Sequence, residues 1–325
     1  MKRKSANLDA PIWFDGTNIN EALFCDEFLN SRKIIFANGA FFTQDGRVTD
    51  DLPLRGEIYE ELKCCAVNNI PRKITNILEV MRLAAHVEGF APEADRIHLA
   101  NGTLKLDGSF IEGRPSIVRS RLLVAYRPDA PAPVRWLSFL DGLLYAEDIP
   151  TLQEFFGYCL IPSTRGQKML LITGKGGEDK SRVGIVLQSL LGSNMKTGSL
   201  SKVETSPFAR ADLQNMLVML DDDMKMEALK QTNYIKSIVT AELPLDLEKK
   251  GLQSYTRRIC GYGFWPLATA RCRPFMTAAL AFSAGRSFWK PRSVTPIGKI
   301  IPIWQKGSVR KRKGFSYGRW KDCGG

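Results

Sequence analysis

The segment Leu170–Gly184, LLITGKGGEDKSRVG, constrains the fold of this chain more than any other. An apolar run is followed by a glycine-rich turn, then by Lys180-Ser181 and a helical pattern that ends at Gly192. A buried strand, a glycine-rich loop, Lys-Ser and a helix in this order are typical of a phosphate-binding loop. The segment therefore predicts an α/β fold with a phosphate site at the amino end of a helix.

The residue types of this loop indicate what it would hold. Glycines let backbone N–H groups wrap a phosphate, and the helix N-terminus adds partial positive charge. Lys180 would reach the β- and γ-phosphates of a nucleotide, and the Ser181 hydroxyl would bind Mg²⁺, so we expect ATP and Mg²⁺ as cofactors. The residues expected to hold the nucleotide are Gly174, Lys175, Gly176, Gly177, Glu178, Asp179, Lys180 and Ser181.

A second segment supplies the carboxylates that such a site needs. NMLVMLDDDM, residues 215–224, is an apolar strand pattern that ends in Asp221, Asp222 and Asp223. One carboxylate would hold the magnesium ion and another would polarise water. An apolar strand with an acidic end is common by itself, but after a phosphate-loop pattern it predicts a nucleotide site. The alternative is a chance glycine loop followed by a solvated acidic turn.

Asp179 stands where such a loop needs its last glycine. An aspartate can adopt positive φ at a cost of about 1 kcal/mol. A carboxylate about 4–5 Å from a triphosphate charge would cost about 3–4 kcal/mol at an effective dielectric constant of 20, partly offset by Lys175, Lys180 and magnesium. We therefore expect nucleotide binding to be about 30- to 1,000-fold weaker than in Asp179→Gly.

The rest of the chain predicts a second, smaller α+β domain before this core. The segment RPDAPAP, residues 127–133, is the best linker candidate because proline favours extended backbone. We expect an N-terminal domain over 1–130, a P-loop core over 131–256 and a tail over 257–325. Other expected elements are helices at 20–28, 54–70 and 71–87, hairpins at 33–49 and 96–113, and two short helices after the linker.

Composition excludes several classes of protein. No apolar run reaches the roughly 18 residues of a membrane span, and residues 1–13 lack the apolar stretch of a signal peptide. The seven cysteines show no metal-site spacing. We therefore expect reduced thiols, a cytoplasmic location and no membrane partner. His86 and His98 have no evident partners in the sequence, so we expect ordinary surface or satisfied core histidines.

The net charge of +12 lies entirely in the tail. From Arg257 onward the chain has 15 lysines and arginines, one acidic residue (Asp322) and four of the six tryptophans. The basic cluster VRKRKG, residues 309–314, is compatible with a nucleic-acid-binding arm.

Several long segments resemble the helicase part of phage and plasmid primase–helicases, which are superfamily 3 ATPases of the AAA+ type. The resemblance runs from about Pro11 to Tyr255. The segments that carry it are RIHLANGTLKLDG, VAYRPDAPAP, DIPTLQEFFGYCLIPSTRGQKMLLITGKGG, SPFARADL, LVMLDDDM and NYIKSIVTAELPLDLEKKG. Relatives usually have Gly-Lys-Ser where this chain has Asp179-Lys180-Ser181.

The resemblance implies a fold and a set of roles. The fold would be a P-loop AAA+ type core, truncated here, after a smaller α+β domain. Lys180 would be catalytic, with Asp221 as magnesium ligand beside Ser181 and Asp222 as the water-polarising carboxylate. Lys249 or Lys250 would contact DNA from a hairpin. The implied partners are single-stranded or forked DNA and, in intact relatives, further copies in a hexamer.

The tail departs from the family. A sensor asparagine in a Gly-Asn-Gly setting and an arginine finger should follow Tyr255, and neither does. Codons read from each third base allow 263–289 to spell VLATGNGTLQALYDRSVGFFRRQIILE, which resembles the missing continuation. We therefore infer a reading-frame shift between about Thr256 and Tyr262 and expect a disordered basic tail; a genuine nucleic-acid arm is the rival interpretation.

The expected function is an ATP-dependent DNA helicase or ATPase of phage or plasmid DNA replication. Asp179 and the missing sensor and finger predict that this copy is impaired. One alternative is a catalytically dead nucleotide- or DNA-binding remnant of such a protein, and another is an inert pseudogene product. No constellation for primer synthesis is visible in residues 1–150.

Overall fold

The computed structural model describes residues 11–65, 68–115, 117–163, 167, 169–174, 179–224, 232–240, 245–249, 255–257 and 265–271. It has a mixed α/β fold and divides into two compact units. The N-terminal unit is Met1–Ala91 with Pro115–Arg121, and the C-terminal unit is Pro92–Arg114 with Leu122–Gly325. The domain limits expected from the sequence stay a prediction.

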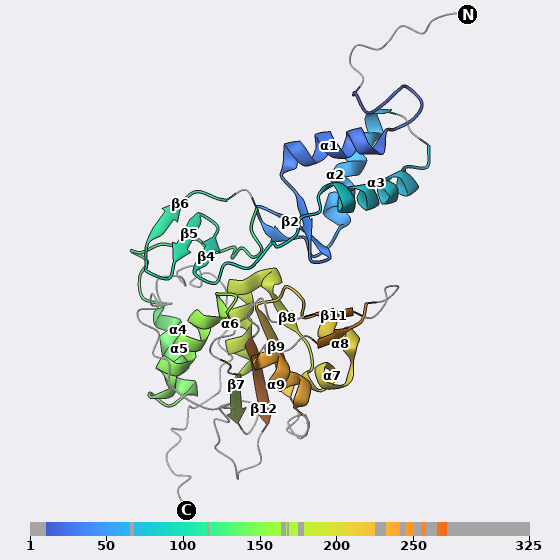
Figure 1. The fold of residues 1–325 in the computed structure, drawn as a ribbon. Helices are drawn as coiled ribbons and strands as arrows, with labels where there is room; N and C mark the ends of the chain where they lie inside the picture. The colour runs from blue at the N-terminus through green and yellow to red at the C-terminus, as the bar shows by residue number, and fades with distance from the viewer. Residues whose placement is uncertain are drawn as a thin grey trace, which may run out of the picture. The chain divides into compact units, whose positions relative to one another are not determined.

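Three helices form most of the N-terminal unit (Figure 1). Helix α1 (Glu21–Arg32) begins after Asn20, whose side chain accepts the N–H of Leu23. Prolines stand in the first turns of α2 (Leu52–Leu62) and α3 (Ile70–Ala84), where a missing N–H costs nothing. A 3₁₀ turn, Lys63–Cys65, follows α2, so the helix expected over 54–70 ends early. The buried core includes Phe24, Phe28, Ile58, Leu62, Ile77, Leu78 and Met81.

A small antiparallel sheet completes this unit. Strands β1 (Ile35–Ala37), β2 (Ala40–Thr43) and β3 (Gly46–Arg47) pair in sequence order. Asn38 and Gly39 between the first two strands have φ of 53° and 75°, the values that a two-residue hairpin turn requires. The hairpin expected from Asn38-Gly39 is confirmed.

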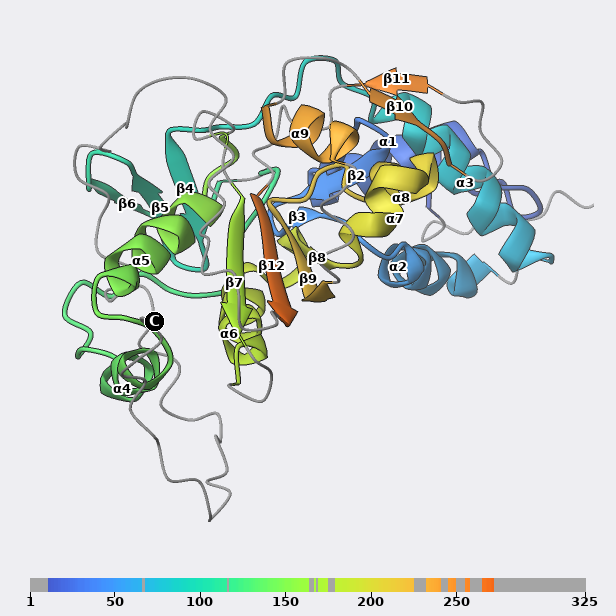
Figure 2. The same cartoon turned by 90° about the horizontal axis from the view of Figure 1, so that it is seen from below.

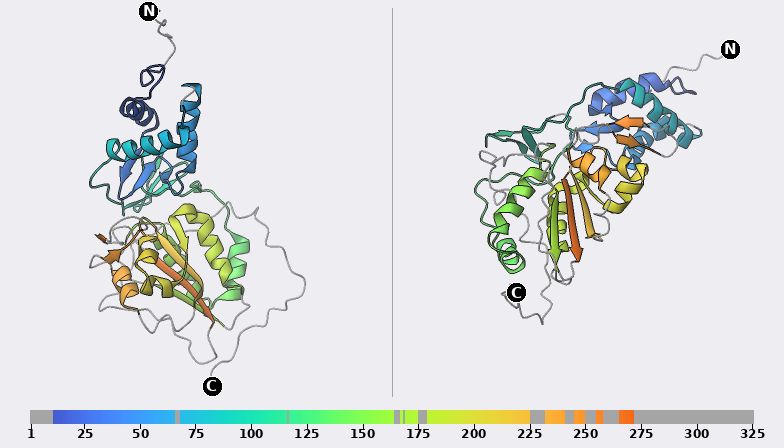
Figure 3. Two further views of the ribbon diagram at one scale, coloured as in Figure 1. Left: turned by 90° about the vertical axis from the view of Figure 1, so that its right-hand side faces the viewer. Right: turned by 60° about the horizontal axis from the view of Figure 1, so that its bottom comes forward.

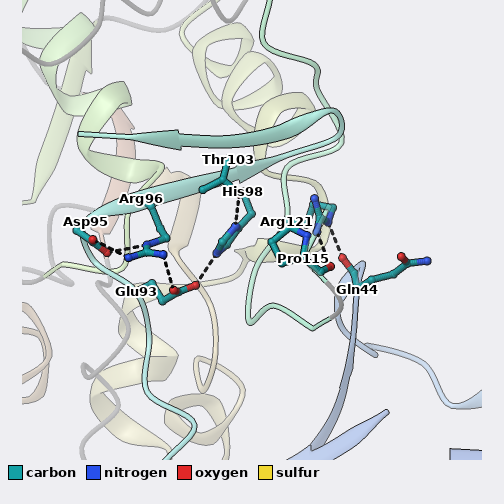
Figure 4. Close-up of polar contacts among 8 residues, drawn as sticks. All are labelled: Gln44, Glu93, Asp95, Arg96, His98, Thr103, Pro115 and Arg121. Atoms are coloured by element: carbon teal, nitrogen blue, oxygen red, sulfur yellow. Dashed lines mark hydrogen bonds and ion pairs between the residues drawn. The ribbon is translucent and has the colours of Figure 1, made fainter. Parts of the chain in front are cut away.

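The segment Pro115–Arg121 also belongs to the N-terminal unit. Arg121 is only 3% exposed. Its guanidinium donates to the backbone carbonyls of Gln44 and Pro115, as Figure 4 shows. The bond to Gln44 fastens the returning segment to the turn between β2 and β3, and the bond to Pro115 lies within the segment.

The C-terminal unit begins with a second antiparallel sheet, formed by β4 (Arg96–Leu99), β5 (Gly102–Lys105) and β6 (Phe110–Glu112). His98 is buried in it. Its Nδ1 lies 3.0 Å from Thr103 Oγ1 and its Nε2 lies 2.7 Å from Glu93 Oε2 (Figure 4). This confirms that His98 is a satisfied core histidine.

A four-stranded parallel sheet forms the centre of the C-terminal unit. Its strands are β7 (Leu170–Gly174), β12 (Trp265–Arg271), β9 (Val218–Met224) and β8 (Met195–Thr197), in this spatial order. Figures 2 and 3 show β7, β12 and β9 side by side. Because the three crossovers keep the strands parallel, their carboxyl ends share one edge of the sheet.

Each side of β9 packs against its own cluster. Val218 and Leu220 join the first cluster, which holds α6 (Ser181–Leu191) and α5 (Asp148–Cys159). Met219 and Met224 join the second, which holds α7 (Leu200–Thr205), α9 (Asn233–Thr240) and part of α8 (Pro207–Ala211). Residues that alternate along the strand thus face different helices. Helix α4 (Val134–Leu143) packs on the first cluster, and a 3₁₀ turn, Gly192–Asn194, follows α6.

The expected disordered tail needs correction for seven residues. Trp265–Arg271 forms β12 and pairs with β7 on one side and β9 on the other. Parallel strands on either side leave a gap whose backbone groups need partners, and this segment fills it. Residues 272–325 lie outside the described part of the chain.

Among the described residues, no helix has the length and apolarity that crossing a membrane requires. The cysteines in the described part of the chain, Cys25, Cys64, Cys65 and Cys159, are all free thiols. Burial raises the pKa of Cys25 to about 11 and that of Cys159 well above its ordinary value, so neither is a nucleophile near neutral pH.

Candidate nucleotide site

The structure describes the last residues of the glycine-rich loop, which lead into α6. Gly174 ends β7, and Asp179, Lys180 and Ser181 lead into the helix. The backbone N–H of Arg182 donates to Asp179 O at 2.9 Å, and that of Val183 donates to Lys180 O at 3.0 Å. The Lys180 side chain is 9% exposed. The strand and the helix that the sequence predicted on either side of the loop are therefore present, while Lys175, Gly176, Gly177 and Glu178 lie outside the described residues.

Asp179 adopts the backbone conformation that a glycine would take more easily. Its φ is 58°, in the left-handed region. Aspartate is among the few non-glycine residues that visit this region. The position thus demands positive φ, as expected from the loop pattern.

The carboxylate of Asp179 lies in a different setting from the one we expected. Its side chain is 70% exposed, and its Oδ1 lies 3.8 Å from Arg182 Nε. Water and a neighbouring cation both screen a surface charge. The repulsion of a bound phosphate should therefore fall at the low end of the expected range.

Gly184 brings α6 close to β9. A Cβ atom added at Gly184 would lie 2.6 Å from Leu220 Cδ2, far inside a normal contact. The first turn of α6 therefore lies against the strand that carries the acidic residues. The sequence carries a signal for this close packing that the prediction of the site did not use: a glycine within a helical pattern.

The acidic end of β9 contains an irregularity. Asp221 pairs with Ala268, but the next pair along is Met224 with Ala270. Two residues of β9, Asp222 and Asp223, therefore oppose one residue of β12, which defines a β-bulge. Bulges re-aim side chains and are frequent beside active sites.

The two aspartates assigned to the site have different surroundings. Asp221 is 7% exposed, and its Oδ2 accepts the N–H of Leu200 at 2.8 Å. Asp222 is exposed. The hydrogen bond to Leu200 turns Asp221 toward α7, and the bulge at Asp222-Asp223 interrupts the alternation of side chains beyond it. The Asp221 carboxylate thus holds the amino end of α7, while Asp222 is open to solvent.

The expected hairpin after α9 is present. Strands β10 (Leu245–Leu247) and β11 (Tyr255–Arg257) pair antiparallel, with Leu247 opposite Tyr255. Lys249 is half-buried in the connection between them, and Lys250 lies outside the described residues. Lys249 therefore follows the end of β10 by two residues, apart in the chain from the residues of the phosphate loop.

Among the side chains that the structure describes, no group of three or more His, Cys, Asp or Glu residues is arranged to hold a metal ion. A magnesium ion bound with a nucleotide needs only one or two protein ligands, because phosphate and water oxygens complete its shell. Ser181 at the start of α6 and the carboxylates of β9 are oxygen donors of the kind that Mg²⁺ prefers.

The comparisons with known proteins are limited in extent. A protein-family model described as a family of unknown function (DUF5906) matches residues 172–262, less than half of the chain. This range includes the end of β7, the acidic strand and the hairpin. No curated protein matches the sequence.

The matching solved structures include three of the C-terminal region of NrS-1. The A form apo structure has a TM-score of 0.49 and 13% identity, and it covers 76% of this chain and 56% of that chain. Two further apo structures have TM-scores of 0.48 with 13% and 14% identity, covering 78% of this chain and 58% and 57% of theirs. This chain thus spans little more than half of those structures, and nothing about its activity follows from a likeness of this extent.

Proposed function

We propose that this chain is an ATP-dependent DNA helicase or ATPase module of phage or plasmid DNA replication, impaired in this copy. One observation carries the proposal: a parallel sheet in which the Lys180-Ser181 helix start follows β7 and an acidic bulge stands at the carboxyl end of β9. In open parallel sheets, ligands bind at this edge. The resemblance stated above supplies the substrate class, which is ATP and DNA.

In this proposal each described residue has a role. Lys180 neutralises the β- and γ-phosphates, and Ser181 binds the magnesium ion together with Asp221. The exposed Asp222 orients and polarises the attacking water. A bound Mg²⁺ would supply neutralisation of phosphate charge, and Asp221 would share its carboxylate between that role and the N–H of Leu200.

The hairpin β10–β11 is the proposed strand contact. Lys249 and Lys250 would neutralise phosphates of single-stranded or forked DNA, which releases counterions and makes binding sensitive to salt. Hexamer formation, which intact relatives would use to surround the strand, stays part of the same proposal.

The register of β12 supports the inferred frame shift. In the shifted frame an asparagine replaces Ala268, and Ala268 is the residue that pairs with both Leu171 and Asp221. The shifted frame would therefore put the sensor asparagine between Leu171 of β7 and Asp221 of β9. Pro266, which lacks an N–H, is opposite Met219 in the middle of the sheet, a place that prolines seldom occupy.

Equilibrium binding of a fluorescent ATP analogue with Mg²⁺ tests the nucleotide site. Lys180→Ala should weaken binding about 10- to 150-fold, because it removes a charged hydrogen-bond donor to phosphate. Lys202→Ala, an exposed lysine on α7, is the matched control and should bind as the unchanged chain does. Equal affinities for the two variants would refute the site.

A second candidate is a nucleotide- or DNA-binding remnant without catalysis. The observation that favours it is Asp179 in the loop, at φ 58°, together with the missing sensor and finger. Single-turnover hydrolysis of radiolabelled ATP separates the two candidates. Turnover that appears with Asp179→Gly and the restored frame supports an impaired motor, whereas binding without turnover in all versions supports the remnant.

A further inference from the structure

Helix α7 connects the acidic strand to the proposed DNA hairpin. At its amino end, the N–H of Leu200 donates to Asp221 Oδ2 at 2.8 Å. Just before it, the N–H of Gly198 donates to Leu220 O at 2.9 Å. The start of α7 is thus tied to the strand that carries the proposed nucleotide-site carboxylates.

Arg210, from α8, holds the opposite end of α7. The side chain is 4% exposed, and its Nη1 donates to Val203 O at 3.0 Å and to Glu204 O at 3.3 Å. These carbonyls belong to the last turn of the helix, where oxygens lack helical partners and a positive charge is favourable. Arg210 therefore caps the carboxyl end of α7.

The same guanidinium reaches the base of the hairpin. Its Nε donates to Asp246 O in β10 at 3.2 Å, and nearby the N–H of Glu248 lies 3.4 Å from Pro207 O. A guanidinium is planar and rigid, so the groups that it bonds keep a fixed spacing. Arg210 therefore bonds the end of α7 and the backbone of β10 at the same time.

Glu204 adds a second connection, to α9. Its Oε2 accepts the N–H of Tyr234 at 3.0 Å and its Oε1 accepts the N–H of Ile235 at 3.2 Å. The Tyr234 ring lies under Arg210, with its centroid 3.9 Å from the guanidinium carbon. We call Glu204, Arg210 and Tyr234 the α7 clamp.

We propose that the α7 clamp transmits the state of Asp221 to the hairpin β10–β11, so that Glu204 and Arg210 are positioning residues for strand binding. In the proposed function Asp221 shares its carboxylate between the Leu200 N–H and the magnesium ion, so a change at the nucleotide site changes its hold on Leu200. The shift of α7 then reaches Asp246 and the loop with Lys249 through Arg210. This inference rests on the proposed function for its nucleotide step.

The coupling is measured as the ratio of two DNA affinities, one with nucleotide present and one without. Binding of a fluorescent single-stranded oligonucleotide is measured with and without a non-hydrolysable ATP analogue and Mg²⁺. The unchanged chain should show a ratio of about 5-fold or more, which is typical of coupled sites. Glu204→Gln and Arg210→Lys should bring the ratio to about 1, with nucleotide affinity in the absence of DNA unchanged.

Asp212→Asn is the matched control, because it removes one negative charge from a side chain that is 62% exposed in the same region. This variant should keep the ratio of the unchanged chain. If Glu204→Gln keeps it too, the clamp transmits nothing and the proposal is overturned. Glu204→Gln decides this even where the buried Arg210→Lys fails to fold, because it is only half-buried and keeps the shape of the side chain.

Hydrogen exchange without any nucleotide tests the mechanical step by itself. Asp221→Ala should raise exchange at α7 and also in the hairpin peptides over 245–257, and Glu204→Gln should raise it in the hairpin. Faster exchange at α7 with an unchanged hairpin overturns the proposal. If the unchanged chain binds no nucleotide, the proposed function fails while the exchange result still decides the inference.

Discussion

The two sheets at the centre of the two units differ in how their order arises. Strands β1, β2 and β3 are consecutive in the chain and pair in that order. Strands β7, β12, β9 and β8 are distant in the chain and pair in an order unlike that of the sequence. The strand order of the first sheet follows from its turns, whereas the strand order of the second follows from the helices that cover its two faces.

Because the two sheets are held in different ways, different substitutions should disrupt them. In the first, Asn38 and Gly39 supply the positive φ that closes the hairpin. In the second, β9 is fixed by Leu220 against α6 on one face and by Met219 against α7 and α9 on the other. Local chemistry should therefore control the N-terminal sheet, and long-range packing should control the C-terminal sheet.

The largest expected effect is the loss of β12. A chain that ends at Arg257 lacks the strand between β7 and β9, and each lost ladder hydrogen bond removes about 1 kcal/mol. Amide exchange in β7 and β9 should approach the rate of an unfolded chain, while β1–β3 should keep its protection. A chain that ends at Arg271 is the control and should behave as the full chain does. Protected β7 and β9 without β12 would contradict the sheet order.

Two substitutions to glycine, one in each unit, compare the effect of a non-glycine residue at positive φ. Asp179→Gly should tighten ATP-analogue binding by about 30-fold, because it removes a carboxylate from the loop and relieves the backbone. Asn38→Gly, the same kind of change in the β1–β2 turn, should leave nucleotide binding unchanged. Measured affinities that are equal for Asp179→Gly and the unchanged chain would show that Arg182 and water screen the charge completely.

Two alanine substitutions compare glycines within helices. Gly184→Ala should lower the free energy of unfolding by about 1–2 kcal/mol, because the new methyl group overlaps Leu220. Gly56→Ala in α2 meets no atom within 4 Å and should raise stability by about 0.5–1 kcal/mol. Urea denaturation, followed by signals local to each unit, measures both values. A stabilising Gly184→Ala would mean that the Leu220 side chain can move away from the new methyl group at little cost.

The smallest expected effect is on DNA binding. Lys249→Gln should lower the slope of log affinity against log salt by about 0.7, the value for one phosphate contact on a single strand. Lys63→Gln, an exposed change in the N-terminal unit, should leave the slope unaltered. Anisotropy titrations with a labelled oligonucleotide at several salt concentrations give both slopes, and equal slopes for the two variants would remove Lys249 from the interface.

Much of the element pattern could be predicted from the sequence, because its signals are local. Asn20 before a helical pattern, Asn38-Gly39 between apolar runs and Gly192 after an amphipathic stretch each act through their own backbone. The strand before Gly174 and the apolar strand that ends in Asp221 were also found in this way. Phosphate binding by the loop stays a prediction.

The candidate site was predicted only in part. The sequence indicated the residue types, but it could not show that Asp221 bonds to Leu200 while Asp222 is exposed. Nor could it show the bulge at Asp222-Asp223 or the close approach of Gly184 to Leu220. These facts depend on which strand lies beside β9, and no local signal carries that information.

The sequence by itself determined the local elements and the chemistry that they can offer: turns, helix ends, a phosphate-loop pattern and an acidic strand. Only the tertiary structure decided the strand order, the place of Trp265–Arg271 between β7 and β9, and the clamp of Glu204, Arg210 and Tyr234 around α7. The physical reason is the separation along the chain over which each kind of interaction acts. Backbone preferences act over a few residues, whereas burial and buried hydrogen bonds join segments that meet only once the chain has folded.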